Sequence, residues 1–338
     1  MSISVANLTK TFGSHHAVSD VSFEVPNNKL FCVVGPSGCG KSTLLRLISG
    51  LETPDTGRIT LDGVPVADTN LFVPPEKRRV GVVFQSYALW PHLTVAENVA
   101  FPYQAQGFTK DDARSRAAAH LGTVALTQFA ERRPEALSGG QRQRVALARC
   151  LAGEARTILM DEPLANLDPH LRETMESELR AFHDSSGVTT LFITHDQREA
   201  MALADVMAVM DAGRILQIGA PQDIYARPSN ETVARFIGRG TLLKATVRDG
   251  AAQICGQAVP VEGGVDGDRT LFVRPAHIQT SAAGWPCRVT AVHYRGSHWE
   301  ATAHGDWLEG DVKLDLPQPV QIGTLLHLTF TGGWVLPS

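Results

Sequence analysis

A short run of glycines and small residues could bind phosphate. Segment 35–43 fits the pattern G-x-x-x-x-G-K-[ST], follows an apolar run at 29–34 and opens a predicted helix at 41–49. Glycine backbone N–H groups and the start of the helix would face phosphate oxygens. Lys41 would add a full charge, and Ser42 could bind Mg²⁺. The alternative is a glycine-rich turn that matches by chance, and the flanking strand and helix argue against it. The predicted nucleotide-binding residues here are Gly35, Pro36, Ser37, Gly38, Cys39, Gly40, Lys41, Ser42 and Thr43.

An acidic pair follows a second apolar run, 157–160. A buried strand there would deliver Asp161 and Glu162 to the end where open α/β sheets bind ligands. Asp161 could hold Mg²⁺, and Glu162 could orient and polarise an attacking water. The pair alone is weak, because the start of a helix often carries both acids.

The octet 137–144 predicts a second anion site. Ser138 can cap a helix while Gly139 and Gly140 expose its first N–H groups, with Gln141 completing the turn. The alternative is an ordinary capped helix with an apolar face, and both interpretations can hold together.

The elements that must position these groups alternate along the chain. Apolar runs at 80–84 and 189–194 read as buried strands, and 169–183 reads as an amphipathic helix. Strands that alternate with helices predict a parallel α/β sheet. Beyond Gly238 short β-like runs replace the helical periodicity. We therefore predict an α/β domain at 1–238 and a small all-β domain at 239–338.

Composition excludes several protein classes. The chain has 338 residues, 43% of them hydrophobic and 20% charged, with a net charge of −4. This is a globular composition without a polybasic nucleic-acid surface. Five dispersed cysteines without a CxxC pair argue against a disulfide framework or a zinc ribbon, and favour a reducing compartment. No signal-peptide region and no apolar run of ~20 residues is visible.

The loop, the octet and the acidic strand end, in this combination, resemble the ABC ATPase family. The resemblance implies a P-loop NTPase fold with a helical subdomain, an ATP hydrolase activity, and ATP with Mg²⁺ at the site. It implies that Phe12 stacks on adenine, that Gln85 binds ATP and Mg²⁺, and that His195 contacts the γ-phosphate in catalysis beside Glu162. Asp168 matches the D-loop, where Asn166 replaces the alanine usual in importers. Outside this context Phe12 could be core and His195 structural.

The resemblance also implies partners. In the family, ATP lies between one subunit's phosphate loop and the other's signature octet, and this chain carries both, which predicts a homodimer. The segment after Gln85 would dock two transmembrane permease subunits through Tyr87, Leu89 and Trp90, although it could simply be core beneath a loop. A solute-binding protein outside the membrane would act indirectly, and the chain would sit peripherally on the cytoplasmic face of the inner membrane.

The β domain resembles the accessory (TOBE-like) domain of importer ATPases. Segment 85–99 looks most like ferric-ion and aminoethylphosphonate import ATPases, and segments 236–240 and 270–275 also look like ferric-ion import ATPases. The alternatives are import of aminoethylphosphonate, polyamines or sugars. Two other classes remain in view: a soluble ABC ATPase acting on nucleic acid, and an exporter subunit. The single ATPase domain without coiled-coil insertions disfavours the first, and the β domain disfavours the second.

Overall fold

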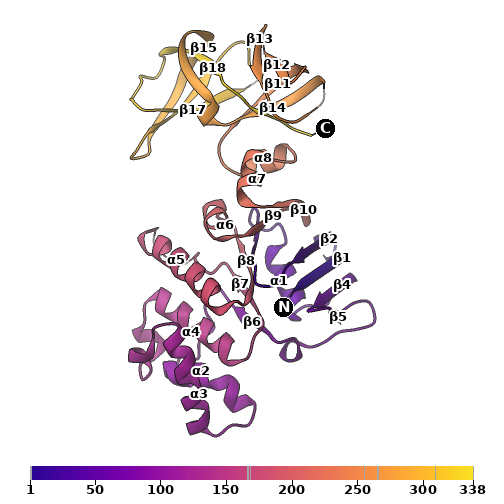
Figure 1. Ribbon diagram of the computed structural model, residues 1–338, viewed down its shortest axis with the longest axis vertical. Helices are drawn as coiled ribbons and strands as arrows, with labels where there is room; N and C mark the ends of the chain where they lie inside the picture. Colours follow the sequence, from indigo (N-terminus) through magenta and orange to yellow (C-terminus); the bar gives the residue numbers. More distant parts are fainter. Residues whose placement is uncertain are drawn as a thin grey trace. The chain divides into compact units, whose positions relative to one another are not determined.

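The computed structural model describes residues 2–165, 167, 169–254, 256–264, 266–308 and 310–337. The chain divides into two compact units, residues 1–221 and 222–338. The predicted fold class is confirmed: a mixed α/β unit is followed by a unit of antiparallel sheets (Figure 1). The limit expected at Gly238 falls inside the second unit and stays a prediction about where the β domain begins.

A six-stranded sheet forms the centre of the first unit. Its strands, in spatial order, are β10 (Arg214–Gly219), β9 (Val206–Asp211), β3 (Leu30–Val34), β8 (Thr189–Thr194), β7 (Thr157–Asp161) and β6 (Val80–Val83). All neighbours pair in parallel except β10 with β9. Every residue of β3 and β8 is buried. Burial along the whole length of a strand is expected in a parallel sheet that is covered on both faces.

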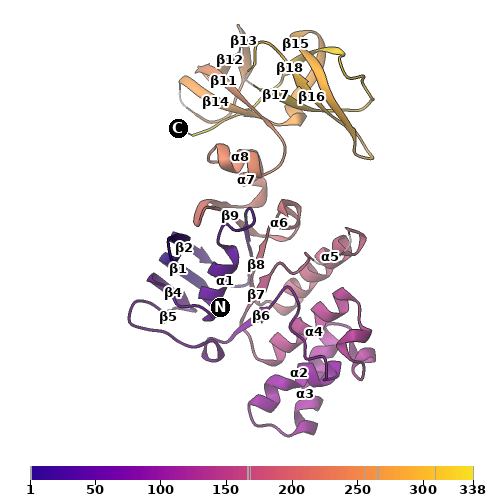
Figure 2. The same ribbon diagram turned by 180° about the vertical axis from the view of Figure 1, so that it is seen from behind.

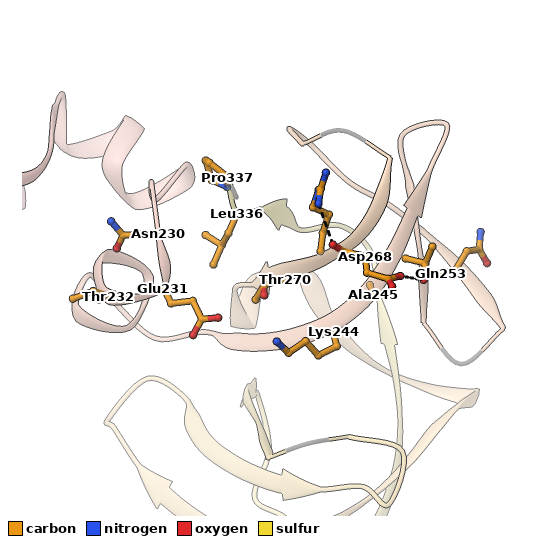
Figure 3. A pocket seen from close by; sticks show the side chains of 12 residues that line it. Asn230, Glu231, Thr232, Lys244, Ala245, Gln253, Asp268, Thr270, Leu336 and Pro337 are labelled. Atoms are coloured by element: carbon orange, nitrogen blue, oxygen red, sulfur yellow. Dashed lines mark hydrogen bonds between the residues drawn. The ribbon is translucent and has the colours of Figure 1, made fainter.

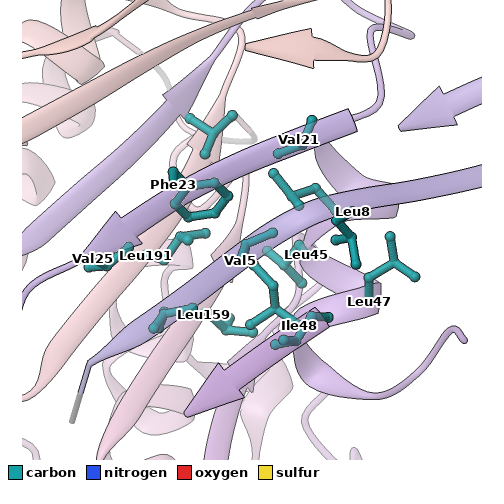
Figure 4. Packing of buried hydrophobic residues seen from close by; sticks show 14 of the residues in the cluster. Val5, Leu8, Val21, Phe23, Val25, Leu45, Leu47, Ile48, Leu159 and Leu191 are labelled. Atoms are coloured by element: carbon teal, nitrogen blue, oxygen red, sulfur yellow. The ribbon is translucent and has the colours of Figure 1, made fainter. Parts of the chain in front are cut away.

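A second, antiparallel sheet covers the first helix. Its order is β2 (His15–Val25), β1 (Ile3–Phe12), β4 (Thr56–Leu61) and β5 (Val64–Ala67). Figure 4 shows side chains of β1 and β2 gathered with those of α1 (Lys41–Ser49), β7 and β8 in one core. Phe23 of β2 stacks on Phe31 of β3, with ring centroids 5.2 Å apart. The helix that follows the phosphate loop is therefore fixed between two sheets.

The helices α2 (Val95–Ala105), α3 (Lys110–Thr123) and α4 (Gly139–Ala152) form a group of their own (Figure 1). Capping boxes begin two of them, Thr94 with Glu97 in α2 and Ser138 with Gln141 in α4. The helices α5 (Pro169–Ser186) and α6 (Gln197–Leu203) follow β7 and β8, and short 3₁₀ turns lie at Pro75–Lys77, Thr127–Phe129 and Pro134–Ala136. None of the helices described is long and apolar enough to cross a membrane.

The second unit begins with two short helices and continues as two sheets (Figure 2). The helices are α7 (Pro221–Ala226) and α8 (Glu231–Phe236). One sheet has the order β13 (Gln257–Pro260), β12 (Ala251–Ile254), β11 (Thr241–Arg248), β14 (Gly267–Val273), β19 (Trp334–Val335). The other has the order β17 (Asp311–Leu316), β16 (Trp299–His304), β15 (Ile278–Tyr294), β18 (Leu325–Phe330), with a 3₁₀ turn at Pro275–His277 before β15. Residues of both sheets share one apolar core that contains Trp285.

Candidate nucleotide-hydrolysis site

Four predicted site segments lie at one edge of the parallel sheet. The strands β3, β8, β7 and β6 are neighbours and parallel, so their carboxyl ends share that edge. Gly35 follows β3, His195 follows β8, Asp161 ends β7, and Gln85 lies two residues beyond β6. This is the edge at which open α/β sheets bind ligands.

Two glycines of the phosphate loop are required by their neighbours. A Cβ on Gly40, whose φ is 109°, would stand 1.9 Å from the carbonyl oxygen of Ala17. A Cβ on Gly35 would stand 2.0 Å from the carbonyl oxygen of Met210. Any side chain at either position would displace backbone. The loop's path is therefore set by close contact with β2 and β9 as well as by backbone freedom.

Lys41 points into the loop that precedes it. Its side chain is buried, and Nζ donates to the carbonyl oxygens of Gly35 at 2.7 Å and Pro36 at 2.9 Å. The Cys39 thiol lies 3.8 Å from Nζ, and burial raises its pKa above the ordinary value. The loop thus holds a cation against its own carbonyl oxygens, a point charge suited to phosphate oxygens.

Ser42 and Asp161 come together from different elements. The Ser42 hydroxyl donates to Oδ1 of Asp161 over 3.3 Å. Burial raises the pKa of the Asp161 carboxyl, while the bond from Ser42 acts in the opposite direction. A half-buried carboxylate beside a hydroxyl is a pair of hard oxygen ligands of the kind that Mg²⁺ prefers. These residues therefore fit the metal that the sequence predicts.

Glu162 and His195 form a pair beside that oxygen cluster. The Nδ1 atom of His195 lies 3.0 Å from Oε1 of Glu162, and both side chains are partly exposed. Glu162 has φ of 45°, a left-handed conformation unusual for a residue other than glycine. Its N–H donates to the carbonyl oxygen of Ile193 at 3.0 Å, which anchors the strained residue to β8. Strain of this kind clusters at functional sites.

A partly buried charge network that includes Asp196, next to His195 in the chain, was not found by sequence reasoning. Arg172 of α5 lies 3.2 Å from Asp196 and 3.6 Å from Glu199. The Thr194 hydroxyl donates to Glu199 at 2.6 Å and accepts from the Asp196 N–H at 3.0 Å. Burial raises the pKa of Glu199. The available signal was acidic residues one and four positions after His195, and it acquires meaning only once α5 brings Arg172 to them.

The signature octet begins α4 as predicted. Ser138 Oγ accepts from the Gln141 N–H at 3.3 Å, and the Gln141 side chain accepts from the Ser138 N–H at 3.0 Å. The glycine pair is also required inside this chain. A Cβ on Gly139 would stand 2.8 Å from Leu167, and one on Gly140 would stand 2.3 Å from Met175. The glycine pair thus begins the helix and also packs tightly against Leu167 and Met175.

Two other predicted site residues have different outcomes. Phe12, at the end of β1, is 48% exposed, with Lys10 Nζ 5.2 Å from its ring centroid. An exposed ring is what stacking on a base requires, and the role stays a prediction. Asp168 and its neighbour Asn166 lie outside the described residues.

Comparison with known proteins places the whole chain. The model of the ABC transporter family matches residues 18–165. The Fe(3+) ions import ATP-binding protein FbpC of Escherichia coli K12 is 38% identical, and the match covers 94% of this chain and 92% of that protein. The chain belongs to the ABC transporter ATPases of the importer type. The spermidine/putrescine import ATP-binding protein PotA of Roseobacter denitrificans is 41% identical, covering 98% of this ATPase and 93% of its relative.

Solved structures agree with the fold of this ATPase. A dimeric ATP-binding cassette, MJ0796, in a post-hydrolysis state with ADP and Pi has a TM-score of 0.56 at 31% identity, covering 65% of this chain and 98% of that chain. The cbiO1 protein of Clostridium perfringens, part of the cbiONQ transporter complex, has a TM-score of 0.60 at 27% identity, covering 69% and 92%. The protein is therefore an ATP-hydrolysing motor subunit of an importer.

The predicted docking segment of the ATPase has a buried and an exposed part. The Tyr87 side chain is only 5% exposed, whereas Leu89 and Trp90 are partly exposed. The Trp90 ring packs on Phe101 of α2, with centroids 4.1 Å apart. A ring as buried as that of Tyr87 is not part of the exposed surface, so the docking prediction is kept for Leu89 and Trp90.

A polar cavity of about 820 Å³ lies in the second unit, well away in sequence from the motifs (Figure 3). Its lining includes Lys244, Arg269, Glu231 and Asp268. The Asp268 carboxylate accepts from the Thr246 hydroxyl at 2.7 Å. Charges of both signs line it, which selects neither a phosphate nor a cation. We assign this cavity no part in ATP hydrolysis.

Proposed function

We propose that this ATPase energises uptake of ferric iron. The full-length similarity to Fe(3+) import ATP-binding proteins supports this solute, since three such relatives match over 90% or more of the chain. Polyamine import is the second candidate. It is supported by a PotA relative that is 41% identical over 98% of the chain and by another that is 49% identical over 71% of the chain. An importer ATPase does not touch the solute, so uptake must decide between them.

The sheet edge supplies the proposed hydrolysis residues. The loop 35–43 would bind the phosphates, with Lys41 turning from its own carbonyl oxygens to those of ATP. Glu162 would accept a proton from the attacking water. Its contact with His195 Nδ1 would hold that ring so that the other ring nitrogen faces the γ-phosphate. The single observation that carries this assignment is the Glu162–His195 pair at the edge that also bears Lys41.

We propose that Ser42, Asp161 and Gln85 hold Mg²⁺. The 3.3 Å contact between Ser42 and Asp161 supports the first two. The metal would supply charge neutralisation for the phosphate oxygens. Gln85 lies exposed in the turn after β6, and β6 is the strand that pairs with β7.

We propose a homodimer that encloses two ATP molecules. The first turn of α4, with Ser138, Gly139, Gly140 and Gln141, would contact ATP held by the other copy, and Asp168 would lie at the same interface. The dimeric state of the MJ0796 cassette supports this arrangement. Loss of the bridging γ-phosphate would then release the two copies, because ATP stabilises the closed state through contacts with both.

The remaining partners follow from the same proposal. Leu89 and Trp90 would contact two transmembrane permease subunits, which places the ATPase peripherally on the cytoplasmic face of the cell's inner membrane. A periplasmic or extracellular solute-binding protein would deliver the solute, and no nucleic acid takes part. Apolar and aromatic anchors set into a groove are typical of helix docking.

Uptake measurements test the solute. Cells lacking the gene receive wild type, Glu162→Gln, or the control Glu76→Gln, an exposed residue of a 3₁₀ turn. Each strain is then given labelled ferric ion or labelled putrescine. We expect wild type and the control, but not Glu162→Gln, to restore iron uptake. If only putrescine uptake is restored, the transported solute is a polyamine and not iron. If uptake of both solutes is independent of the gene, both candidate solutes are rejected.

A further inference from the structure

The turn between β6 and α2 has an unfavourable backbone. Tyr87 has φ of 63° and Ala88 has φ of 45°, so two consecutive residues other than glycine are left-handed. In this conformation Cβ lies too close to the following carbonyl oxygen. Such a pair persists only where neighbouring groups hold it. We call residues 85–90 the Q-turn.

One arginine of α4 holds the Q-turn by its backbone. Arg149 Nη1 donates to the carbonyl oxygen of Ala88 at 2.7 Å, and Nη2 donates to that of Tyr87 at 3.1 Å. The guanidinium carbon also lies 4.9 Å from the Trp90 ring centroid. In the part of the chain described, Arg149 makes no ion pair with a carboxylate. The described interactions of its guanidinium group are therefore the hydrogen bonds to the two strained residues and the contact with the Trp90 indole.

Helix α2 holds the end of the Q-turn. Asn98 is fully buried, accepts from the Trp90 N–H at 2.9 Å, and donates to the Trp90 carbonyl oxygen at 3.1 Å. Trp90 is thus attached to α2 through Asn98 and Phe101, and to α4 through Arg149. The Q-turn consequently belongs mechanically to the helical group.

The Q-turn also meets the signature end of α4. A Cβ on Gly139 would lie 3.8 Å from the Tyr87 hydroxyl. Among the residues that the structure describes, that hydroxyl and both amide atoms of Gln143 are buried and have no hydrogen-bond partner. Gln143 is one helical turn after Gly139, on the same face of α4. Arg149 acts about 15 Å further along the helix, at ten residues of 1.5 Å rise.

We propose that Arg149 is a positioning residue that makes the Q-turn and α4 move as one body. Movement of the signature end, where the other copy's ATP would bind, is then delivered to Leu89 and Trp90. Arg149 acts through the Q-turn and touches neither nucleotide nor partner. The inference rests on the proposed docking of a permease at Leu89 and Trp90.

The test compares isolated ATPase with the complete transporter in liposomes. The measured quantity is the ratio of ATP hydrolysis by the transporter to hydrolysis by the isolated protein. Arg149→Lys keeps the charge and loses the fork. Arg116→Lys is the matched control, because Arg116 lies on α3 of the same helical group, outside the Q-turn and the signature octet, with its guanidinium carbon 4.3 Å from the Phe108 ring centroid. Trp90→Ala tests the docking surface itself.

We expect Arg149→Lys to lower the ratio roughly tenfold while isolated hydrolysis and ATP affinity stay within about twofold of wild type. Arg116→Lys should keep the wild-type ratio. A wild-type ratio in Arg149→Lys, with Trp90→Ala impaired, would overturn the inference and leave the docking proposal standing. A wild-type ratio in Trp90→Ala would instead remove the docking surface and the inference with it.

A second variant separates positioning from folding. Ala88→Gly removes the steric cost of the left-handed conformation. If Arg149 holds this strained turn, adding Ala88→Gly to Arg149→Lys should recover most of the lost ratio. If the ratio does not recover, Arg149 only stabilises the helical group. The same conclusion would follow if Arg149→Lys lowered the melting temperature and reduced hydrolysis by the isolated protein as much as hydrolysis by the transporter.

Discussion

The two units use β structure in opposite ways. In the first, β3, β8, β7 and β6 run parallel and deliver their following residues to one edge, where Lys41, Glu162 and His195 lie. In the second, the pairs of named strands that the structure describes are antiparallel, and β17 alternates exposed and buried residues along its whole length. Polar groups there are spread over a solvated face. Strand direction therefore concentrates chemistry in one unit and disperses it in the other.

The sharpest way to break this comparison is Glu162→Gln. The amide keeps the size of the side chain but cannot take a proton from water, so we expect hydrolysis to fall by roughly 10²–10⁴-fold. ATP affinity and the melting temperature of both units should remain near wild type. Phosphate release and calorimetric titration with ATP measure these quantities. Retained hydrolysis would mean that the base lies elsewhere on the edge.

The converse experiment acts on the second unit. Trp285 is 6% exposed, and its ring centroid lies 5.6 Å from that of Trp307 and 5.2 Å from that of Phe330. Trp285→Ala should lower that unit's free energy of unfolding by about 3–5 kcal/mol through the cavity it leaves. Ile322→Ala, at a position 69% exposed, is the control. Scanning calorimetry should show one transition shifted with ATP binding unchanged, and loss of ATP binding would contradict separate roles.

The smallest expected effect is a pH dependence in the first unit. Burial lowers the pKa of His183 below 6.5; its Nδ1 lies 3.1 Å from the Thr190 hydroxyl. The unfolded chain then binds the proton more readily than the folded chain. The contribution of neutral His183 to the free energy of unfolding is present above about pH 6.5 and is lost as pH falls through the folded pKa. Melting temperatures between about pH 5 and 7.5 should fall less steeply in His183→Gln. Equal slopes would assign the acid sensitivity to other groups.

Local patterns predicted the elements that carry the motifs. The buried strand before Gly35, the helix at 41–49, and the strand at 189–194 are confirmed with bounds within a residue. Apolar continuity and glycine spacing are local signals, so they were readable. The strand β15 (Ile278–Tyr294) was predicted only at 288–293, because Gly284 and Pro286 inside it are typical strand breakers. A register shift in its pairing with β18, between Thr280 and Trp285, accommodates Gly284, whereas Pro286 lies opposite His327 in the resumed register.

Side-chain partnerships were beyond local patterns. Nothing near Arg149 in the sequence points to the carbonyl oxygens of Tyr87 and Ala88, because the contact spans more than sixty positions. The same is true of Arg172, which meets Asp196 from another helix. The aromatic character of Tyr87 suggested a surface, but burial against α4 decided its place. Residue types predicted which chemistry was available, and tertiary contacts selected the groups that support it.

The close contacts at Gly35 and Gly40 mean that other strands determine the conformation of the phosphate loop. The path of its backbone is limited by two carbonyl oxygens, those of Met210 and Ala17, on strands that carry no recognisable motif. A substitution that shifts either strand by a few tenths of an ångström would change the conformation of the loop while every residue of the motif stays the same. Two relatives with identical loops could thus differ in nucleotide affinity, and the cause would lie in strands that a motif search never inspects.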